Sequence, residues 1–167
     1  MSPQDIIDLL RLKPHPNEGG FYREMYRSAA RIPQASLPGY SGDRAAGTGI
    51  YYLLTPATCS AMHRLPGDEM FHHYLGDAVE LLLLHSSGEG DVVVLGKDLE
   101  RGERPQVVVP GGCWQGSKLV RGGTVALLGT TMSPGFEFAD YQHGDRAELI
   151  AAYPEWAERI AELTTSF

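Results

Sequence analysis

Residues 62–76 concentrate side chains that could bind a metal or move a proton. This segment holds His63, Glu69, His72 and His73, and further along the chain Gln115 follows a Pro-Gly-Gly-Cys-Trp turn. Imidazole and carboxylate groups are ligands of borderline divalent metals, and they are also common general acids and bases. The sequence therefore predicts a site for metal binding or acid–base chemistry built from these residues.

Strand alternation predicts which of these side chains share a face. In an extended segment Glu69, Phe71 and His73 point to one side, whereas His72 points to the other. A bulge at residues 66–68 would reverse the assignment, so either His72 or His73 is expected at the wall of the site.

The elements that must position these residues have the pattern of strands. Short alternating or apolar segments, many of them separated by Gly- and Pro-rich turns, are typical of a sandwich or barrel. Two blocks of four such strands favour an all-β jelly roll. The predicted strands are residues 49–54, 58–64, 70–75, 78–85, 91–95, 106–109, 113–118 and 124–132, and residues 28–47 are expected to form a long loop.

Helical patterns occur at the two ends of the chain. Ser2 suits an N-cap and Pro3 a first helical position, before an apolar face that includes Ile6. Near the other end Asp145 begins a capping box, and Pro154 opens a further helical pattern. We expect these short helices to lie on the outside of the barrel.

The composition bounds the remaining possibilities. With 167 residues the chain is expected to form one domain, residues 1–167. The net charge of −7 with scattered basic residues argues against binding to nucleic acid or to an anionic membrane surface. No signal peptide and no membrane-spanning apolar run is evident, so a cytoplasmic location with Cys59 and Cys113 reduced is expected.

Several motifs in order along the chain resemble the cupin-5 family of the cupin superfamily. They are Pro14-His15-Pro16-Asn17-Glu18-Gly19-Gly20-Phe21-Tyr22-Arg23-Glu24, Ile50-Tyr51-Tyr52-Leu53-Leu54, His63-Arg64, Asp68-Glu69, His72, Gly76-Asp77, Pro110-Gly111-Gly112-Cys113-Trp114-Gln115, Ser133-Pro134-Gly135-Phe136-Glu137-Phe138, Asp140-Tyr141 and the closing Tyr153-Pro154 helix. The resemblance implies a double-stranded β-helix, the cupin barrel. It also implies a homodimer related in shape to sugar-nucleotide 3,5-epimerases, with the reaction unassigned.

The same resemblance suggests a partly altered metal site. Cupins usually bind a metal through two His and one Glu of the first motif and one His of the second. His63 and Glu69 keep their places here, but Leu65 and Gln115 occupy the other two positions. His73, or His72 if a bulge rotates it, could restore a third strong donor, and the tentative metal set is His63, Glu69, His72 and Gln115. This set suits iron, manganese, nickel or zinc.

A site without metal is the other interpretation. His63 would act as general base with Glu69 as its carboxylate partner, because an imidazole that titrates near neutrality suits removal of a proton next to a carbonyl. Tyr52, or Tyr22 or Tyr51, would be the proton donor. The predicted substrate-binding residues are Arg23, Arg64, Phe71, His73, Trp114 and Gln115.

Together these patterns predict a small-molecule-binding cupin. The favoured function is an epimerase- or isomerase-like enzyme that acts on a small polar, sugar-like or carbonyl-containing substrate. The alternatives are a metal-dependent cupin enzyme and a non-catalytic module that binds a small ligand. Residues 19–26 combine aromatic and charged side chains ahead of the long loop, so we expect a homodimer in which this segment joins a neighbour's sheet edge.

Overall fold

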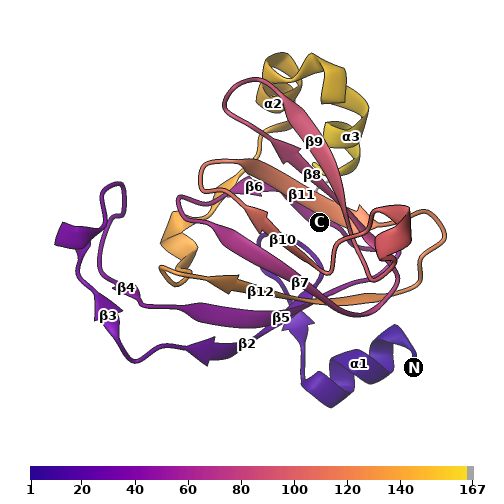
Figure 1. Cartoon of the computed structure of the whole chain (residues 1–167), viewed down its shortest axis with the longest axis horizontal. Coiled ribbons are helices and arrows are strands. Elements are labelled where there is room, and N and C mark those ends of the chain that lie inside the picture. Colours follow the sequence, from indigo (N-terminus) through magenta and orange to yellow (C-terminus); the bar gives the residue numbers. More distant parts are fainter. Residues whose placement is uncertain (165–167) are drawn as a thin grey trace.

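The computed structural model of the protein describes residues 1–164. Two antiparallel β-sheets face each other and form a barrel (Figure 1). The six-stranded sheet has the order β1 (Lys13–Pro14), β2 (Phe21–Arg27), β5 (Thr48–Leu54), β12 (Ala126–Met132), β7 (Glu69–Gly76) and β10 (Gln106–Val109). The five-stranded sheet has the order β13 (Gln142–His143), β6 (Ser60–Arg64), β11 (Trp114–Leu119), β8 (Val79–Leu84) and β9 (Gly90–Leu95). The predicted all-β jelly-roll barrel is confirmed.

The eight predicted strands correspond to β5–β12, with bounds that differ by at most a few residues. The predicted long loop instead carries a small arm that projects from the barrel (Figure 1). This arm contains β3 (Arg31–Ile32), the 3-10 turn η1 (Gln34–Ser36) and β4 (Arg44–Ala45), and β3 pairs with β4. Two further 3-10 turns are η2 (Leu99–Arg101) and η3 (Phe138–Asp140).

The run of four leucines in β8 shows how both faces of a strand are used. Leu81 and Leu83 point between the two sheets, where they join the interior apolar cluster. Leu82 and Leu84 point outward and pack under the C-terminal helices. Because both faces are covered, this strand is apolar throughout rather than alternating with polar residues.

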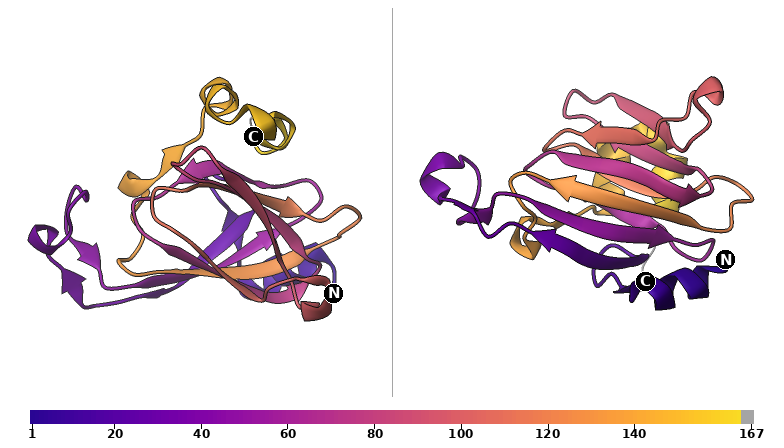
Figure 2. Two further views of the ribbon diagram at one scale, coloured as in Figure 1. Left: turned by 45° about the horizontal axis from the view of Figure 1, so that its top comes forward. Right: turned by 60° about the horizontal axis from the view of Figure 1, so that its bottom comes forward.

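The terminal helices lie on the outside of the barrel (Figure 2). The C-terminal group, α2 (Arg146–Ala152), η4 (Pro154–Trp156) and α3 (Ala157–Glu162), packs on the five-stranded sheet through Leu149 and Ile160. Helix α1 (Pro3–Leu10) begins with a Ser2–Asp5 capping box and packs through Ile6 against the other sheet. Both expected helical ends are therefore present as short peripheral elements.

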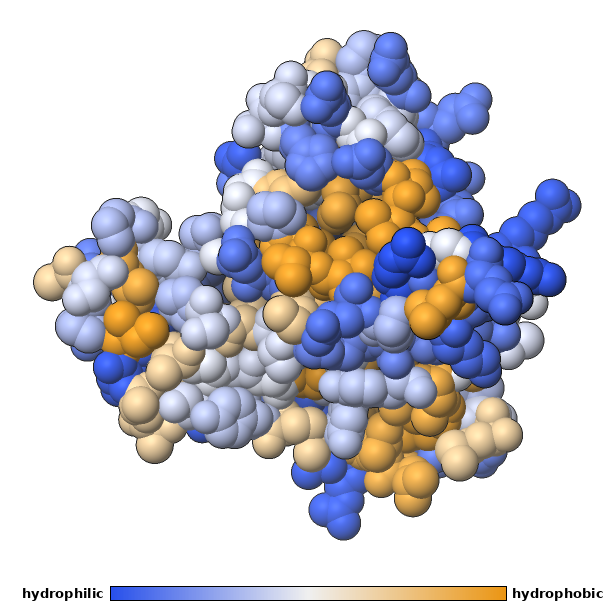
Figure 3. All heavy atoms as spheres, in the orientation of Figure 1, coloured by the Kyte–Doolittle hydropathy of each residue, from blue (hydrophilic) through white to orange (hydrophobic). Residues whose placement is uncertain are grey.

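Polar and charged residues cover much of the face in Figure 3, where apolar residues gather below the C-terminal helices. Val108 of β10 is among the exposed apolar side chains. No helix in residues 1–164 is long and apolar enough to span a membrane.

Candidate active site

A cavity of about 250 Å³ opens at one end of the barrel, between the two sheets and the loop that joins β1 to β2. Its polar lining residues are Lys13, His15, Glu18, Glu24, Arg27, Thr48, His63, Glu69 and Thr130. Its apolar and aromatic lining residues are Tyr22, Ile50, Leu65, Met132, Phe136 and Phe138. A concave site in which apolar and aromatic side chains surround convergent titratable groups is typical of a small-molecule site.

His63 is held with one ring nitrogen committed to the backbone. The side chain is buried in β6, and its Nδ1 lies 2.7 Å from the carbonyl oxygen of Ala61. A carbonyl oxygen only accepts, so Nδ1 must carry the proton, and in the neutral ring Nε2 keeps its lone pair. The ring of Tyr141 stacks on His63 with a centroid distance of 5.1 Å and an interplanar angle of 17°. The imidazole is therefore fixed in orientation as well as in tautomer.

His15 has the opposite arrangement of its ring nitrogens. Its Nδ1 accepts a hydrogen bond from the backbone N–H of Glu18 at 3.0 Å, so in the neutral ring Nε2 carries the proton. Burial lowers the pKa of His15, and the nearby Glu18 carboxylate only partly opposes this effect. His15 Nε2 lies 3.8 Å and His63 Nε2 lies 3.9 Å from the same Glu18 oxygen, Oε2. A hydrogen-bond donor and a proton acceptor therefore flank one carboxylate.

The loop that carries His15 and Glu18 is tied to the neighbouring strands. The carbonyl of Glu18 accepts from the N–H of Ala61 at 2.8 Å, and its carboxylate accepts from the hydroxyl of Ser60. The hydroxyl of Tyr52 donates to the carbonyl of Gly19 at 2.7 Å. Gly20 has φ +70° and lies so close to Leu53 and Tyr52 that a Cβ would clash. These contacts hold Glu18 beside β6.

Glu69 and Gln115 form a buried pair behind His63. Gln115 Nε2 donates to Glu69 Oε2 at 2.8 Å, and Gln115 lies directly opposite His63 in the pairing of β11 with β6. Burial raises the pKa of Glu69, and repulsion from the Glu18 carboxylate adds to this effect. His63, Thr130 and Gln115 oppose it. A carboxyl with a raised pKa beside an imidazole is typical of sites that transfer protons.

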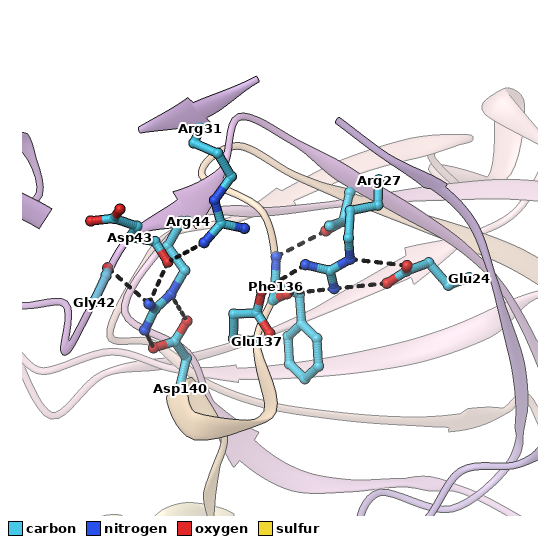
Figure 4. Close-up of polar contacts among 10 residues, drawn as sticks. Glu24, Arg27, Arg31, Gly42, Asp43, Arg44, Phe136, Glu137 and Asp140 are labelled. Carbon is cyan, nitrogen blue, oxygen red and sulfur yellow. Dashed lines mark hydrogen bonds and ion pairs between the residues drawn. The ribbon is translucent and has the colours of Figure 1, made fainter. Parts of the chain in front are cut away.

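Two arginines hold the segment that forms the outer wall of the cavity (Figure 4). Arg27 donates to Glu137 at 2.7 Å and also to the carbonyl of Phe136 at 3.0 Å. Arg44, at the base of the arm, forms a buried two-pronged ion pair with Asp140, in which the Nε–Oδ2 distance is 2.8 Å. Asp140 directly precedes Tyr141, so these pairs position the ring that stacks on His63.

The structure brings three of the sequence-predicted site residues together: His63, Glu69 and Gln115. Tyr52 is fully buried beneath the cavity, where its ring belongs to the interior cluster and burial raises its pKa well above the ordinary value. Because its hydroxyl is committed to Gly19, we do not assign Tyr52 as the proton donor. Phe71 also belongs to the interior cluster and does not line the cavity.

Five other predicted residues lie away from the cavity. His72 points to the outer face of the sheet, as alternation from Glu69 requires, and its Nε2 lies 2.9 Å from the Thr131 hydroxyl. His73 is further along β7, where its Nε2 lies 2.9 Å from the carbonyl oxygen of Asp77. The remaining three are used structurally: Arg23 donates to the carbonyl of Leu10 at 3.0 Å, and Arg64 lies 4.6 Å over the ring of Trp114, which packs against the C-terminal helices.

Sequence reasoning missed His15, Glu18 and Tyr141 as site residues. All three belong to motifs that carry the family resemblance, but none lies in a predicted strand with a detectable orientation. The available signal was the spacing of His15 and Glu18 in a turn rich in Pro and Gly. The side chains of this pair are 5% and 14% exposed, which is low for polar groups in a turn.

The predicted metal set does not fit the geometry. His72 faces outward, and Glu69 is already bonded to the amide of Gln115. The outer nitrogen of His15 carries a proton, because the inner one accepts from the backbone. Within residues 1–164 no group of three or more His, Cys, Asp or Glu side chains is arranged to hold a metal ion. We therefore derive no chemical step through a metal.

Comparison with known proteins identifies the family. The family described as "Cupin superfamily (DUF985)" matches residues 4–144. An uncharacterized protein of Saccharomyces cerevisiae is 30% identical over 84% of this chain and 74% of its own length. A hypothetical protein from Leishmania major has a TM-score of 0.88 at 31% identity, covering 99% of this chain and 100% of its own. A Shewanella oneidensis protein has a TM-score of 0.87 at 36% identity, covering 100% and 99%. The chain belongs to the cupin superfamily, in the family designated DUF985.

Proposed function

We propose that the cavity is an acid–base site that moves a proton next to the carbonyl of a small polar substrate, as in an epimerisation or isomerisation. The observation that carries this proposal is the opposite polarity of the two imidazole edges at Glu18. His63 Nε2 bears a lone pair and His15 Nε2 bears a proton, and both lie within 4 Å of one carboxylate oxygen.

In the proposed step His63 Nε2 takes a proton from the carbon next to the carbonyl. The electrons of the broken C–H bond move to the carbonyl oxygen, which becomes an enolate oxygen and accepts a hydrogen bond from His15 Nε2–H. Return of a proton to carbon regenerates the carbonyl and the neutral imidazole. No oxidant and no second reactant is needed.

Glu18 has a supporting role in this proposal. Once protonated, the imidazolium of His63 would face the Glu18 carboxylate, and attraction between opposite charges would favour the charged form. The stacked ring of Tyr141 keeps the imidazole from rotating away. Pre-organised groups of this kind act by removing the cost of orientation during the reaction.

Proton exchange with solvent tests this step without knowledge of the product. The protein is incubated in D₂O with a panel of small aldoses, ketoses and keto acids, and NMR measures loss of the signal of the proton next to the carbonyl. We expect exchange with at least one compound and a loss of about 10²–10⁴-fold in His63→Gln, the range of general-base catalysis. His72→Gln is the matched control, because this imidazole lies outside the cavity, and it should exchange at the wild-type rate.

Two outcomes would contradict the proposal. Equal rates in wild type and His63→Gln would remove His63 as the base. Binding of the panel in the cavity without any exchange would favour the alternative of a non-catalytic module for a small ligand.

A further inference from the structure

Behind the cavity, next to the lining residue Glu69, two buried polar side chains of β11 have an atom without a hydrogen-bond partner among the described residues. Gln115 is 1% exposed and uses its Nε2 on Glu69, while its Oε1 has no partner among the described residues. The hydroxyl of Ser117, two residues along the same strand, is also without a partner there. Both side chains point between the sheets, since their partners in β8 are Leu83 and Leu81 of the interior cluster. A buried acceptor without a donor costs about 1–3 kcal/mol, so a ligand hydroxyl that reaches Gln115 Oε1 past Glu69 would stabilise this pair.

Two of the three carboxylates that line the cavity strengthen this preference. Glu18 and Glu69 have no lysine or arginine as ion-pair partner within residues 1–164. The nitrogens nearest to Glu18 belong to two imidazoles, and the partner of Glu69 is an amide. An anionic group placed among these carboxylates would be repelled, whereas hydroxyl groups can donate to them.

The lining cations do not compensate for this repulsion. The guanidinium of Arg27 is already used on Glu24, on Glu137 and on the carbonyl of Phe136 (Figure 4). Lys13 lies at the exposed rim, 5.3 Å above the ring of Tyr22, and contacts between exposed charges contribute at most about 1 kcal/mol. Phosphate recognition typically uses arginines with free donors or a helix N-terminus, and neither lines this cavity in the described chain.

The walls and size suit a compact ligand with an apolar face. Phe136, Phe138 and Ile50 line one side of the cavity, and the volume of about 250 Å³ is below the range of roughly 300–1,000 Å³ that drug-sized ligands occupy. A sugar ring offers apolar C–H groups to such a wall and hydroxyl donors to the carboxylates of Glu18 and Glu69.

We infer that the cavity binds a small, hydroxyl-rich carbonyl compound without an anionic group, of the size of a free monosaccharide, and discriminates against its phosphate esters and nucleotide conjugates. The inference rests on the proposed function in that it concerns the same cavity, and it names the substrate class for that site.

Binding of matched probe pairs tests the inference. Glucose, mannose, galactose and fructose are each compared with the corresponding 6-phosphate by saturation-transfer NMR at neutral pH, up to 10 mM. At least one neutral sugar should bind, and its phosphate ester should bind at least tenfold more weakly. Gln115→Met, which keeps the length of the side chain and removes its polar atoms, should weaken binding of the neutral sugar at least tenfold.

Control variants keep this test interpretable. Gln106→Met changes an exposed glutamine outside the cavity and should bind like wild type. If Gln115→Met does not fold, Glu69→Gln removes the charge of a carboxylate that lines the cavity and should weaken the neutral sugar at least threefold.

Three results would overturn the inference: binding of none of the neutral sugars, equal or tighter binding of a phosphate ester, or an affinity for the neutral sugar that is unchanged in both Gln115→Met and Glu69→Gln. The measurement needs no turnover, so a failure of the proton-exchange experiment would leave a positive binding result intact. Conversely, exchange that occurs only with phosphate esters would support the proposed function and refute the inferred substrate class.

Discussion

At the scale of single residues, the buried carboxyl of Glu69 links the chemistry of the site to its stability. Desolvation and the neighbouring Glu18 raise its pKa, so the folded protein holds a proton on Glu69 that the unfolded chain releases more easily. Stability contributed by this group is present at low pH and is lost as the pH rises through the folded pKa. The site therefore keeps Glu69 at a cost in stability near neutral pH.

We predict that Glu69→Gln raises the free energy of unfolding at pH 7 relative to wild type. The amide can still accept a hydrogen bond from Gln115, but it has no charge to desolvate. The difference should disappear near pH 4, below the ordinary Glu pKa of 4.5, where both proteins are neutral at this position. Urea unfolding at the two pH values measures the effect, and a gain that is equal at both would show that ionisation is not its cause.

The Tyr52 hydroxyl gives a second prediction at this scale. Tyr52→Phe should lower stability by about 1–3 kcal/mol, since the carbonyl of Gly19 would lose its donor in a buried position. It should also weaken the proton exchange, because Gly19 follows Glu18 directly. Tyr74→Phe, at an exposed aromatic on the outer face, is the control for urea unfolding and should change stability by less than about 0.5 kcal/mol. Unaltered stability in Tyr52→Phe would contradict this role.

At the scale of elements, the arm is joined to the site by one buried ion pair. Arg44 and Asp140 are 4% and 8% exposed in their side chains, and they connect β4 to the turn η3. Removing one partner of a buried pair leaves the other charge unpaired. This lowers the free energy of unfolding more than replacing both partners with apolar side chains does.

Arg44→Met should therefore destabilise the protein by about 3–5 kcal/mol. Arg31→Met, in the same arm but at an exposed side chain that donates to the Asp43 carbonyl, should change stability by less than about 0.5 kcal/mol. The double variant Arg44→Met/Asp140→Leu should recover much of the loss. Thermal unfolding measures all three, and an equal effect of the two single arginine variants would argue against the buried pair as the cause.

The C-terminal helices give a contrasting prediction. Ile160 is fully buried against the outer face of the five-stranded sheet, so Ile160→Ala should cost about 2–5 kcal/mol. Sugar binding by the folded fraction should not change, because this cluster lies outside the barrel. Glu158→Ala on the exposed side of α3 serves as the control. A loss of sugar affinity in folded Ile160→Ala would show that the helices influence the cavity.

Elements with a clear repeat of apolar and polar residues were predictable from the sequence, and so were the site residues that lie on them. His63, Glu69 and Gln115 were found because strands alternate and because motif spacing assigns them to facing strands. His15 and Glu18 were missed because a turn has no period, and only the contact with β6 reveals what the turn approaches. The outward direction of the His72 side chain could be decided only from the path that β7 takes after the turn at residues 66–68.

At the scale of the whole molecule, one edge of the six-stranded sheet is only partly covered. Strand β2 pairs with β5 of its own chain, and on its other side β1 covers Phe21 and Tyr22 alone. An open edge favours a further strand. We propose that the protein is a homodimer by strand exchange, in which residues 19–26 of each chain join the sheet edge of its partner.

Light scattering at micromolar concentration should give about twice the chain mass of 18.2 kDa. A monomeric mass would refute the dimer.

The strand order has a consequence for the time course of folding. Strand β12 lies between β5 and β7 in the sheet, although it comes after both in the chain, and Tyr141 comes later still. As the chain grows on the ribosome, His15 and Glu18 would therefore emerge long before β12 and Tyr141, which complete the surroundings of these two residues. Barrels with such distant contacts fold in roughly milliseconds to seconds. During synthesis the site would thus be among the last parts of the protein to mature.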